Sequence, residues 1–564
     1  MGNHSTTITH SHSFESFLID RHILSDDLAC VVRREMYKQQ VSLEKVLLSF
    51  HLIDEQHLTR LLSDFSGLPV IELSGHCSLL PSLSSSLSQE LFTRPTWVPF
   101  KQENNVLHIA VSDPLNKREV EQIAYQLSSF NCIFYVGASS QIEALCEPAS
   151  QQDMSLSELF STLDASALTL PSLASAEMIP PIFQQCLKEA VQKGASDIHF
   201  EPEHKLIQIR LRIDGRLTPY HFFHKDFWDS FCVHLKICAQ MNIAESRLPQ
   251  SGHFSKKIHG KEVDFRISTH PTKHGESIVI RLLDRAKALL PLEEIGFPSA
   301  VVSSLKETIQ SKQGLFIVSG PTGSGKTTTL YSILSYLNSP QHNIMTLEQP
   351  IEYELPFVRQ TEIQDSSFFT FSQGIRSVLR QDPDILFIGE IRDQDTAQMA
   401  LRASMTGHQV FTTLHTGRAL GAIPRLMDLG VSPSILAGNL RGLLSQRLVR
   451  KLCANCRKER PPSFQESCLI PIKVECLYDA VGCPQCNHTG YQGRFPLVEF
   501  IPCTNQFNQL ILAKEPLSVL EKEAQEIGYM PLPLHGIQAI VSGTTTLSEV
   551  RSVISLDKKF YDYL

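Results

Sequence analysis

The sequence has no long hydrophobic run, no signal-peptide pattern and no excess of basic residues. No stretch of about 18 consecutive apolar residues occurs in the chain, so we expect no transmembrane helix. The N-terminus is polar and lacks the basic-then-apolar order of a signal peptide. The chain has 51 Lys and Arg against 59 Asp and Glu, and this net charge of −8 gives no general reason to bind nucleic acid. These absences predict a cytosolic protein.

A disulfide framework is also absent, although the chain has 14 cysteines. Four of them form two C-x-x-C pairs, which suit a metal in a reducing compartment. Four thiolates make a closed tetrahedral Zn²⁺ site, which we expect to be structural, with an inserted loop between the pairs. Unligated thiols and a redox pair remain as alternatives. The predicted ligands are Cys453, Cys456, Cys483 and Cys486. We expect most of the other ten to be buried free thiols; they are Cys30, Cys77, Cys132, Cys146, Cys186, Cys232, Cys238, Cys468, Cys476 and Cys503.

The sequence pattern of the N-terminal quarter predicts helices followed by a small α/β unit. Of the 564 residues, 42% are hydrophobic and 20% are charged, which suits several globular domains. We expect a disordered tail over 1–13 and an N-terminal domain over 1–147. Three amphipathic helices are predicted there, the third capped by Asp54, before two short strands. Residues 148–177 are rich in Ser, Ala and Asp and predict a linker.

The middle of the chain predicts a small α+β domain over 178–285. A helix should end at Gly194, and the following strands alternate apolar and polar residues around an Asp214-Gly215 turn. Over 292–450, apolar strand-like runs alternate with helical stretches, which predicts a mostly parallel sheet with helices on both faces. The rest is expected to divide into a zinc-binding subdomain, 451–500, and a C-terminal helical region, 501–564.

One motif predicts nucleotide binding. The segment GPTGSGKT satisfies G-x-x-x-x-G-K-[ST] between a predicted strand and a predicted helix. Its backbone N–H groups and the helix N-terminus should wrap the phosphates, with Lys326 on the β and γ phosphates and Thr327 on Mg²⁺. The alternative is a chance glycine-rich turn. The predicted binding residues are Gly320, Pro321, Thr322, Gly323, Ser324, Gly325, Lys326, Thr327 and Thr328.

Hydrolysis of a nucleotide also needs an acid that orients water or holds Mg²⁺. Glu390 follows the apolar strand DILFI and is the first candidate for water activation. Glu348 ends the strand NIMTL and is a second candidate at the same rim of a parallel sheet. The alternative for both is a solvated glutamate at a strand end.

Several blocks together resemble the secretion ATPases of the type II secretion and type IV pilus group, in the branch that assembles pili or pseudopili. The blocks run in family order over more than half of the chain. They are KGASDIHFEP, RLPQSGHF, DFRISTHPTKHGESIVIRLLD, GPTGSGKTTTLY, LEQPIEY, LRQDPDILFIGEIRD and TGHQVFTTLHT.

The resemblance implies roles for matched positions. It places Glu390 in the Walker B block and Glu348 in an acidic box, where this chain has Glu348-Gln349-Pro350 instead of the usual Glu-Asp-Pro. It places two histidines in a box thought to sense the γ-phosphate, although they are as readily scaffold residues. It places two arginines of the small domain over the nucleotide, where a planar cation can neutralise phosphoryl charge. The histidines are His408 and His415, the two arginines are Arg266 and Arg281, and further matched arginines are Arg376, Arg380 and Arg392.

The resemblance also implies an architecture and an activity. It implies a multidomain α/β protein: a RecA-like P-loop core, a PAS-like α+β domain before it, a tetracysteine subdomain after it and an N-terminal docking domain. It implies a homo-hexamer that hydrolyses ATP with Mg²⁺, carries Zn²⁺ and drives pilus or pseudopilus assembly from the inner face of the cytoplasmic membrane, on an inner-membrane platform protein. A nucleotide-binding scaffold with negligible turnover and a nucleic-acid translocase are the alternatives. Because the chain has no Arg-Leu-Gly, we expect no cyclic-di-GMP binding.

Overall fold

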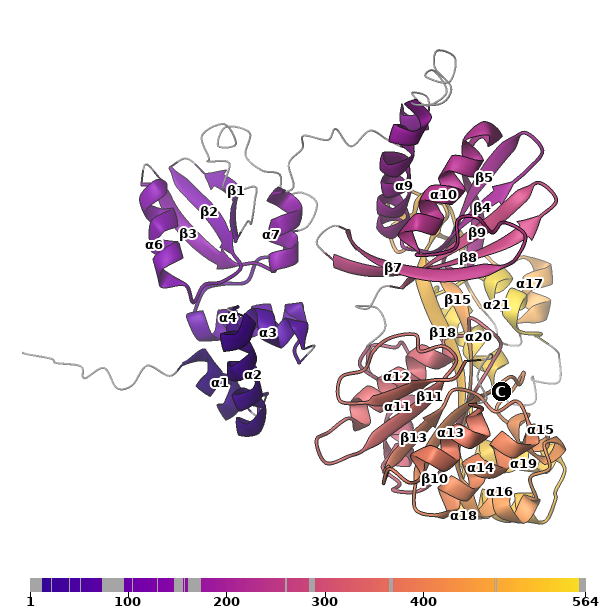
Figure 1. Ribbon diagram of the computed structural model, residues 1–564. Coiled ribbons are helices and arrows are strands. Elements are labelled where there is room, and N and C mark those ends of the chain that lie inside the picture. The colour runs from indigo at the N-terminus through magenta and orange to yellow at the C-terminus, as the bar shows by residue number, and fades with distance from the viewer. Residues whose placement is uncertain are drawn as a thin grey trace, which may run out of the picture. The chain divides into compact units, whose positions relative to one another are not determined.

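The computed structural model describes residues 13–556 except 22, 40, 51, 74–95, 104, 129, 147–155, 157, 161–173, 259–260, 284–289, 365–368, 471 and 473. Three sheets of three, six and seven strands carry most of the architecture (Figure 1). No helix in the described part of the chain combines the length and apolar character that a membrane span needs. The predicted tail lies outside the described residues except Ser13, and so does most of the predicted linker.

Four short helices open the described chain and share one apolar core. The predicted third helix begins after Asp54, whose side chain accepts the His57 N–H at 2.7 Å, as the N-cap prediction requires. Gly67, with a φ of 74°, ends it. The first helix, which the sequence did not predict, contributes Phe14 and Leu18 to the core. The helices are α1 (Phe14–Asp20), α2 (Asp26–Gln39), α3 (Leu43–Ser49) and α4 (Glu55–Ser66).

A three-stranded sheet follows, in the order β1-β2-β3. The first pair is antiparallel and the second is parallel, so the unit is α/β as predicted. Val136 of β3 packs in the core of the four helices and pairs with Val70, which joins helices and sheet in one domain. The elements are β1 (Trp97–Glu103), β2 (Val106–Val111), α6 (Lys117–Gln126), β3 (Asn131–Val136) and α7 (Ser139–Cys146).

The small α+β domain is a six-stranded sheet in the order β6-β5-β4-β9-β8-β7. Its first helix starts at Ala174, inside the predicted linker, and Gly194 adopts the left-handed conformation after it. Asp214 and Gly215 have φ values of 49° and 85° and form the predicted turn. The elements are α9 (Ala174–Gln192), β4 (Ala195–Pro202), β5 (Leu206–Ile213), β6 (Arg216–His224), α10 (Trp228–Cys238), β7 (Gln250–Ile258), β8 (Lys261–Thr272) and β9 (Gly275–Leu283).

The largest sheet has seven strands in the order β12-β11-β13-β14-β10-β15-β18. All neighbours pair in parallel except β15 and β18, which are antiparallel. The mostly parallel prediction is therefore confirmed. The last strand comes from residues that the sequence assigned largely to the zinc-binding segment. The strands are β10 (Gly314–Ser319), β11 (Ile344–Glu348), β12 (Arg359–Glu362), β13 (Ile385–Ile388), β14 (Gln409–Leu414), β15 (Leu440–Leu452) and β18 (Tyr491–Pro502).

Helices cover both faces of this sheet because successive strand residues point to opposite sides. On β10, Leu315 and Ile317 join one core with α13, α14, α16, α18 and α19, whereas Phe316 and Val318 join another with α11 and α12. The helices are α11 (Ser299–Ile309), α12 (Lys326–Leu337), α13 (Phe371–Val378), α14 (Gln394–Met405), α15 (Ala422–Asp428), α16 (Pro433–Asn439), α18 (Asn505–Leu512), α19 (Leu517–Glu526), α20 (Leu532–Val541) and α21 (Leu547–Val553).

The segment between β15 and β18 carries the four paired cysteines. The predicted insertion between the pairs contains β16 (Arg457–Arg460), α17 (Phe464–Leu469) and β17 (Leu477–Ala480), and its two strands pair antiparallel. The segment therefore leaves the seven-stranded sheet at the end of β15 and returns to it at the start of β18.

A buried ion pair in the small domain generates a stability prediction. Lys236 Nζ lies 2.7 Å from Glu276 Oε2, and the two side chains are 2% and 8% exposed. Lys236→Met would leave the Glu276 carboxylate buried without its cation, and removing one partner of such a pair costs about 3–5 kcal/mol. We expect that loss in the free energy of unfolding, measured in denaturant by the fluorescence of Trp228, whose Nε1 donates to the Glu276 carbonyl.

The matched control is Lys236→Met with Glu276→Met, both in a Trp97→Phe background that leaves one tryptophan. The double variant should recover most of the lost stability, since two apolar side chains replace both charges. Equal instability of the single and double variants would contradict this account.

Candidate functional site

The loop after β10 has the geometry of a phosphate-binding loop. Gly320 has a φ of 150°, and a Cβ there would lie 2.7 Å from the Gln446 carbonyl oxygen. Gly325 has a φ of 90°, and its Cβ would lie 2.8 Å from Gln446 Nε2. Only glycine fits both positions, because each combines a positive φ with a contact too close for a side chain. The helix α12 begins at the next residue, Lys326, so its free N–H groups point at the loop.

Lys326 and Ser324 show that this loop is built for an anion. In this structure Lys326 Nζ donates to the carbonyl oxygens of Gly320 and Pro321, at 2.9 and 3.0 Å. Burial lowers the pKa of Lys326, against the opposing effect of Glu390. Ser324 Oγ is buried and has no hydrogen-bond partner among the described residues. A polyphosphate would supply an acceptor for the Ser324 hydroxyl and a negatively charged partner for Lys326, so the residues present fit a nucleotide.

Gln446 of β15 holds this loop and was missed by the sequence analysis. It is 1% exposed, its Nε2 donates to the Ser324 carbonyl at 2.7 Å, and its Oε1 accepts from Thr329 Oγ1 at 2.8 Å. A buried amide with both ends bonded fixes the loop before any ligand binds. The sequence offered little signal for it, because the run LRGLLSQRL also holds two arginines and a serine beside the glutamine.

Glu390 and His415 meet the loop at the carboxyl edge of the sheet. The parallel register pairs Ser319 with Leu414, so the residues that follow them, Gly320 and His415, leave the sheet side by side. His415 Nε2 lies 3.5 Å from Glu390 Oε2, and Arg392 Nη2 forms an ion pair with Glu390 Oε1. Ligands of such sheets bind at this edge. Three of the predicted site residues are thus brought together beside the phosphate loop.

Glu348 also ends a strand at this edge, but its side chain is 3% exposed and fully engaged. Tyr331 of α12 donates to Oε2 at 2.5 Å, and Thr346 and Gln360 donate to Oε1 at 2.6 and 3.0 Å. Burial raises the pKa of Glu348, and the three donors oppose that effect. In this structure Glu348 ties the phosphate-loop helix to β11 and β12. Gln349 follows it directly.

The second predicted histidine, His408, is not brought to this site. It precedes β14, whereas His415 follows it, and its carbonyl accepts the Gly314 N–H at the start of β10. Its Nδ1 bonds to the Ala403 carbonyl and the Thr406 hydroxyl, both at 3.0 Å. The six-residue strand separates the two histidines by about 20 Å.

The predicted arginines lie on several elements. Arg376 is an exposed residue of α13, and Arg380 is exposed just after it. Arg266 belongs to β8 and Arg281 to β9 of the six-stranded sheet. Arg281 Nε donates to Asp197 Oδ1 at 3.2 Å, so in this structure it forms an ion pair within its own sheet.

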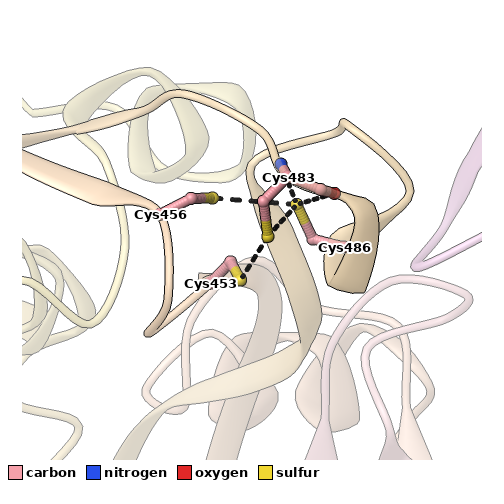
Figure 2. Close-up of side chains that lie close together, drawn as sticks. All are labelled: Cys453, Cys456, Cys483 and Cys486. Carbon is pink, nitrogen blue, oxygen red and sulfur yellow. Dashed lines mark hydrogen bonds between the residues drawn. The ribbon is translucent and has the colours of Figure 1, made fainter.

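The four paired cysteines converge at one point between β15 and β18 (Figure 2). Neighbouring sulfurs lie 3.7 to 3.9 Å apart, and all four lie within 4.8 Å of one another. With Zn–S bonds of about 2.3 Å, the sulfurs of a tetrahedral site lie about 3.8 Å apart, so the spacing fits zinc. A redox pair would require only two of the four to meet.

Backbone N–H groups donate to two of these four sulfurs. Gly482 donates to Cys456 Sγ at 3.3 Å, and both Cys483 and Gly490 donate to Cys486 Sγ at 3.2 Å. Burial raises the pKa of Cys486, but the two N–H donors and the neighbouring thiols outweigh it and lower the pKa to about 6. Burial and the hydrogen bonds with the other thiols raise the pKa of Cys456 to about 12, against the opposing effect of the Gly482 N–H. Such outer-shell donors hold thiolate ligands in place around a metal.

The sheet order, the phosphate loop and the acid at the strand end define a P-loop nucleotide hydrolase. The family model described as Type II/IV secretion system protein matches residues 172–552, and an MshEN domain model matches residues 66–156. The chain belongs to this secretion and pilus ATPase family.

Relatives of the chain include proteins named for type II secretion and proteins named for type IV pilus assembly. The chain is 38% identical over 463 residues to the type II secretion system protein E of Aeromonas hydrophila, with 79% of this chain and 91% of that protein covered. It is 34% identical over 552 residues to the type IV pilus assembly ATPase PilB of Myxococcus xanthus, with 94% and 97% covered. The X-ray structure of the Legionella pneumophila ATPase DotB shares the fold, with a TM-score of 0.51 at 19% identity over 66% of this chain and 95% of that chain.

The sulfur cluster generates a prediction about metal content. Purified protein should contain one Zn²⁺ per chain, and Cys456→Ser should lose most of it because three thiolates no longer close the site. Cys476→Ser is the matched control: Cys476 is a free cysteine of the same segment outside the cluster, so its zinc content should stay at one. Elemental analysis measures both, and metal-free wild-type protein with four free thiols here would rule the site out.

Proposed function

We propose that this protein hydrolyses ATP to power the assembly of type IV pili. The observation that carries the proposal is the meeting of Lys326, Glu390 and His415 at the carboxyl edge of a sheet whose chain belongs to the secretion and pilus ATPases. The phosphate loop binds, the acid acts on water, and the family connects hydrolysis to an assembly machine.

Each residue has a separate part in the reaction. The loop from Gly320 to Thr328 binds the phosphates through its N–H groups, and Lys326 turns from its carbonyl partners to the β and γ phosphates. Glu390 orients the attacking water, and Arg392 and His415 hold its carboxylate in place. Glu348 acts by keeping α12 against β11, and its direct contact with Mg²⁺ would require release from three hydrogen bonds.

Two metals belong to this proposal. Thr327, the first hydroxyl after Lys326, would hold Mg²⁺, which supplies charge that neutralises the phosphate oxygens. Zn²⁺ would sit among Cys453, Cys456, Cys483 and Cys486 and hold the inserted segment together.

The assembly and the cellular place are part of the same proposal. The protein works as a homo-hexamer at the cytoplasmic face of the inner membrane, where Arg266 and Arg281 of the small domain close over a nucleotide. The N-terminal domain docks on a membrane platform protein. The support is the resemblance of the motif blocks and the pilus and secretion names of the relatives. Size-exclusion chromatography with light scattering, with and without nucleotide, tests the hexamer.

Type II secretion is the second candidate function. It is favoured by the 38% identity to the Aeromonas hydrophila protein, whereas pilus assembly is favoured by a match that spans 94% of this chain and 97% of the Myxococcus xanthus protein. Deletion of the coding sequence, followed by electron microscopy of surface pili and analysis of secreted proteins, separates the two. Lost pili with normal secretion support the proposal, and the opposite result supports the second candidate.

Glu390→Gln tests the catalytic assignment. The substitution keeps the shape and hydrogen-bonding reach of the side chain but removes its charge, so ATP should still bind while turnover falls by about 10²–10⁴. Phosphate release measures the rate, and a fluorescent ATP analogue measures binding. Lys326→Ala is the comparison variant, in which both binding and turnover should fail. Normal turnover in Glu390→Gln would remove Glu390 from the mechanism.

A further inference from the structure

A buried carboxylate outside the predicted site, Glu499, holds the chain that leaves β14. Glu499 lies on β18, is 1% exposed and pairs in register with Ser445 of β15. Its Oε1 accepts the Ala419 N–H at 2.5 Å. Its Oε2 accepts the Tyr529 hydroxyl at 2.8 Å and the Leu532 N–H at 3.2 Å. One side chain therefore joins the loop after β14 to the turn between α19 and α20.

Ala419, Tyr529 and Leu532 all donate to Glu499, so both of its carboxylate oxygens act as acceptors. Burial raises the pKa of Glu499, and the donors, together with the positive charge of Arg418, oppose that effect. Arg418 itself bonds to Tyr529 and forms an ion pair with Glu521. A carboxylate removed from water is tolerated only where hydrogen bonds and charge replace its hydration. The network is therefore a rigid anchor, and removing any acceptor leaves a buried N–H without a partner.

Ala419, the residue of this loop that Glu499 holds, lies four residues beyond His415. A second anchor comes from the neighbouring strand β15, where Arg447 Nη2 donates to the Gly417 carbonyl at 2.7 Å. Within the loop, Thr416 Oγ1 donates to the Arg418 carbonyl at 3.0 Å. Loop 415–421 is thus held at Gly417 by β15 and at Ala419 by β18, and His415 at its start lies 3.5 Å from Glu390.

We propose that Glu499 is a positioning residue for ATP hydrolysis, which fixes loop 415–421 so that His415 stays against Glu390. This inference rests on the proposed function, because it assigns Glu499 an effect on turnover rather than on the phosphates. Misplacement of a catalytic group by about 1 Å can cost up to about 10²-fold in rate. The phosphate loop is held separately by Gln446, so nucleotide affinity should not depend on Glu499.

Glu499→Gln is the test variant. Its amide keeps the volume of the side chain, but one oxygen becomes a donor, so either Ala419 or Leu532 loses its acceptor. We expect kcat for ATP to fall about 10- to 100-fold while KM changes by less than about twofold. Glu523→Gln is the matched control, because Glu523 is a buried glutamate of α19 whose described bond goes to Gln506. It should leave both constants near those of wild type.

A double-mutant cycle with His415→Ala shows whether the effect passes through the loop. If Glu499 acts by placing His415, Glu499→Gln should lower kcat in the wild-type background and have no further effect on His415→Ala. Losses that multiply, a silent His415→Ala variant, or a folded Glu499→Gln with normal kcat would each overturn the inference.

Two further measurements keep these outcomes interpretable. Circular dichroism and thermal melting establish folding, and if Glu499→Gln does not fold, Glu499→Asp replaces it, with a smaller kcat loss expected because the charge is kept. Wild-type turnover that Lys326→Ala abolishes upholds the proposed function whatever Glu499 does. Absence of wild-type turnover would instead refute the proposed function itself.

Discussion

The nucleotide site depends on how one antiparallel strand pair is attached to the parallel sheet. β15 pairs in parallel with β10 on one side and antiparallel with β18 on the other. From this pair, Gln446 holds the phosphate loop, and Arg447 and Glu499 hold the loop that carries His415. The two loops therefore take their relative position from polar side chains of this strand pair, of which Gln446 and Glu499 are buried. Such preorganisation matters where charge develops during a reaction, since the site does not have to rearrange when it forms.

Features that depend on local rules were predictable from the sequence. The phosphate loop needs glycine at Gly320 and Gly325, and the motif places glycine at both. The alternation of strands and helices from β10 to β14 predicted a parallel sheet. The four cysteines were predicted to meet because each pair needs only one tight turn. Glu390 was predicted because an acid just beyond a buried strand lies at the sheet edge where ligands bind.

Features that depend on distant partners were not predictable. β7 alternates between exposed and partly exposed residues along most of its length, so its run QSGHFSKKI carries little apolar signal and its strand state comes from pairing with β8. The role of Gln446 requires knowing that β15 lies beside β10, and that of Glu499 requires the return of the chain after the cysteine-bearing segment. Glu348 looked like an exposed acid at a strand end, and only the fold shows Tyr331 and Gln360 bonded to it.

The cysteine-bearing segment is also the connection that the chain must close before β18 can pair with β15. Long connections slow the pairing of strands because closure costs entropy before contacts compensate for it. Until β18 arrives, β15 is an open sheet edge, which is the kind of surface on which chains aggregate. A metal that gathers Cys453 and Cys486 would bring the two strands together early. If that metal is the proposed zinc, its supply during synthesis would govern how much of this protein matures, at a site apart from the phosphate loop.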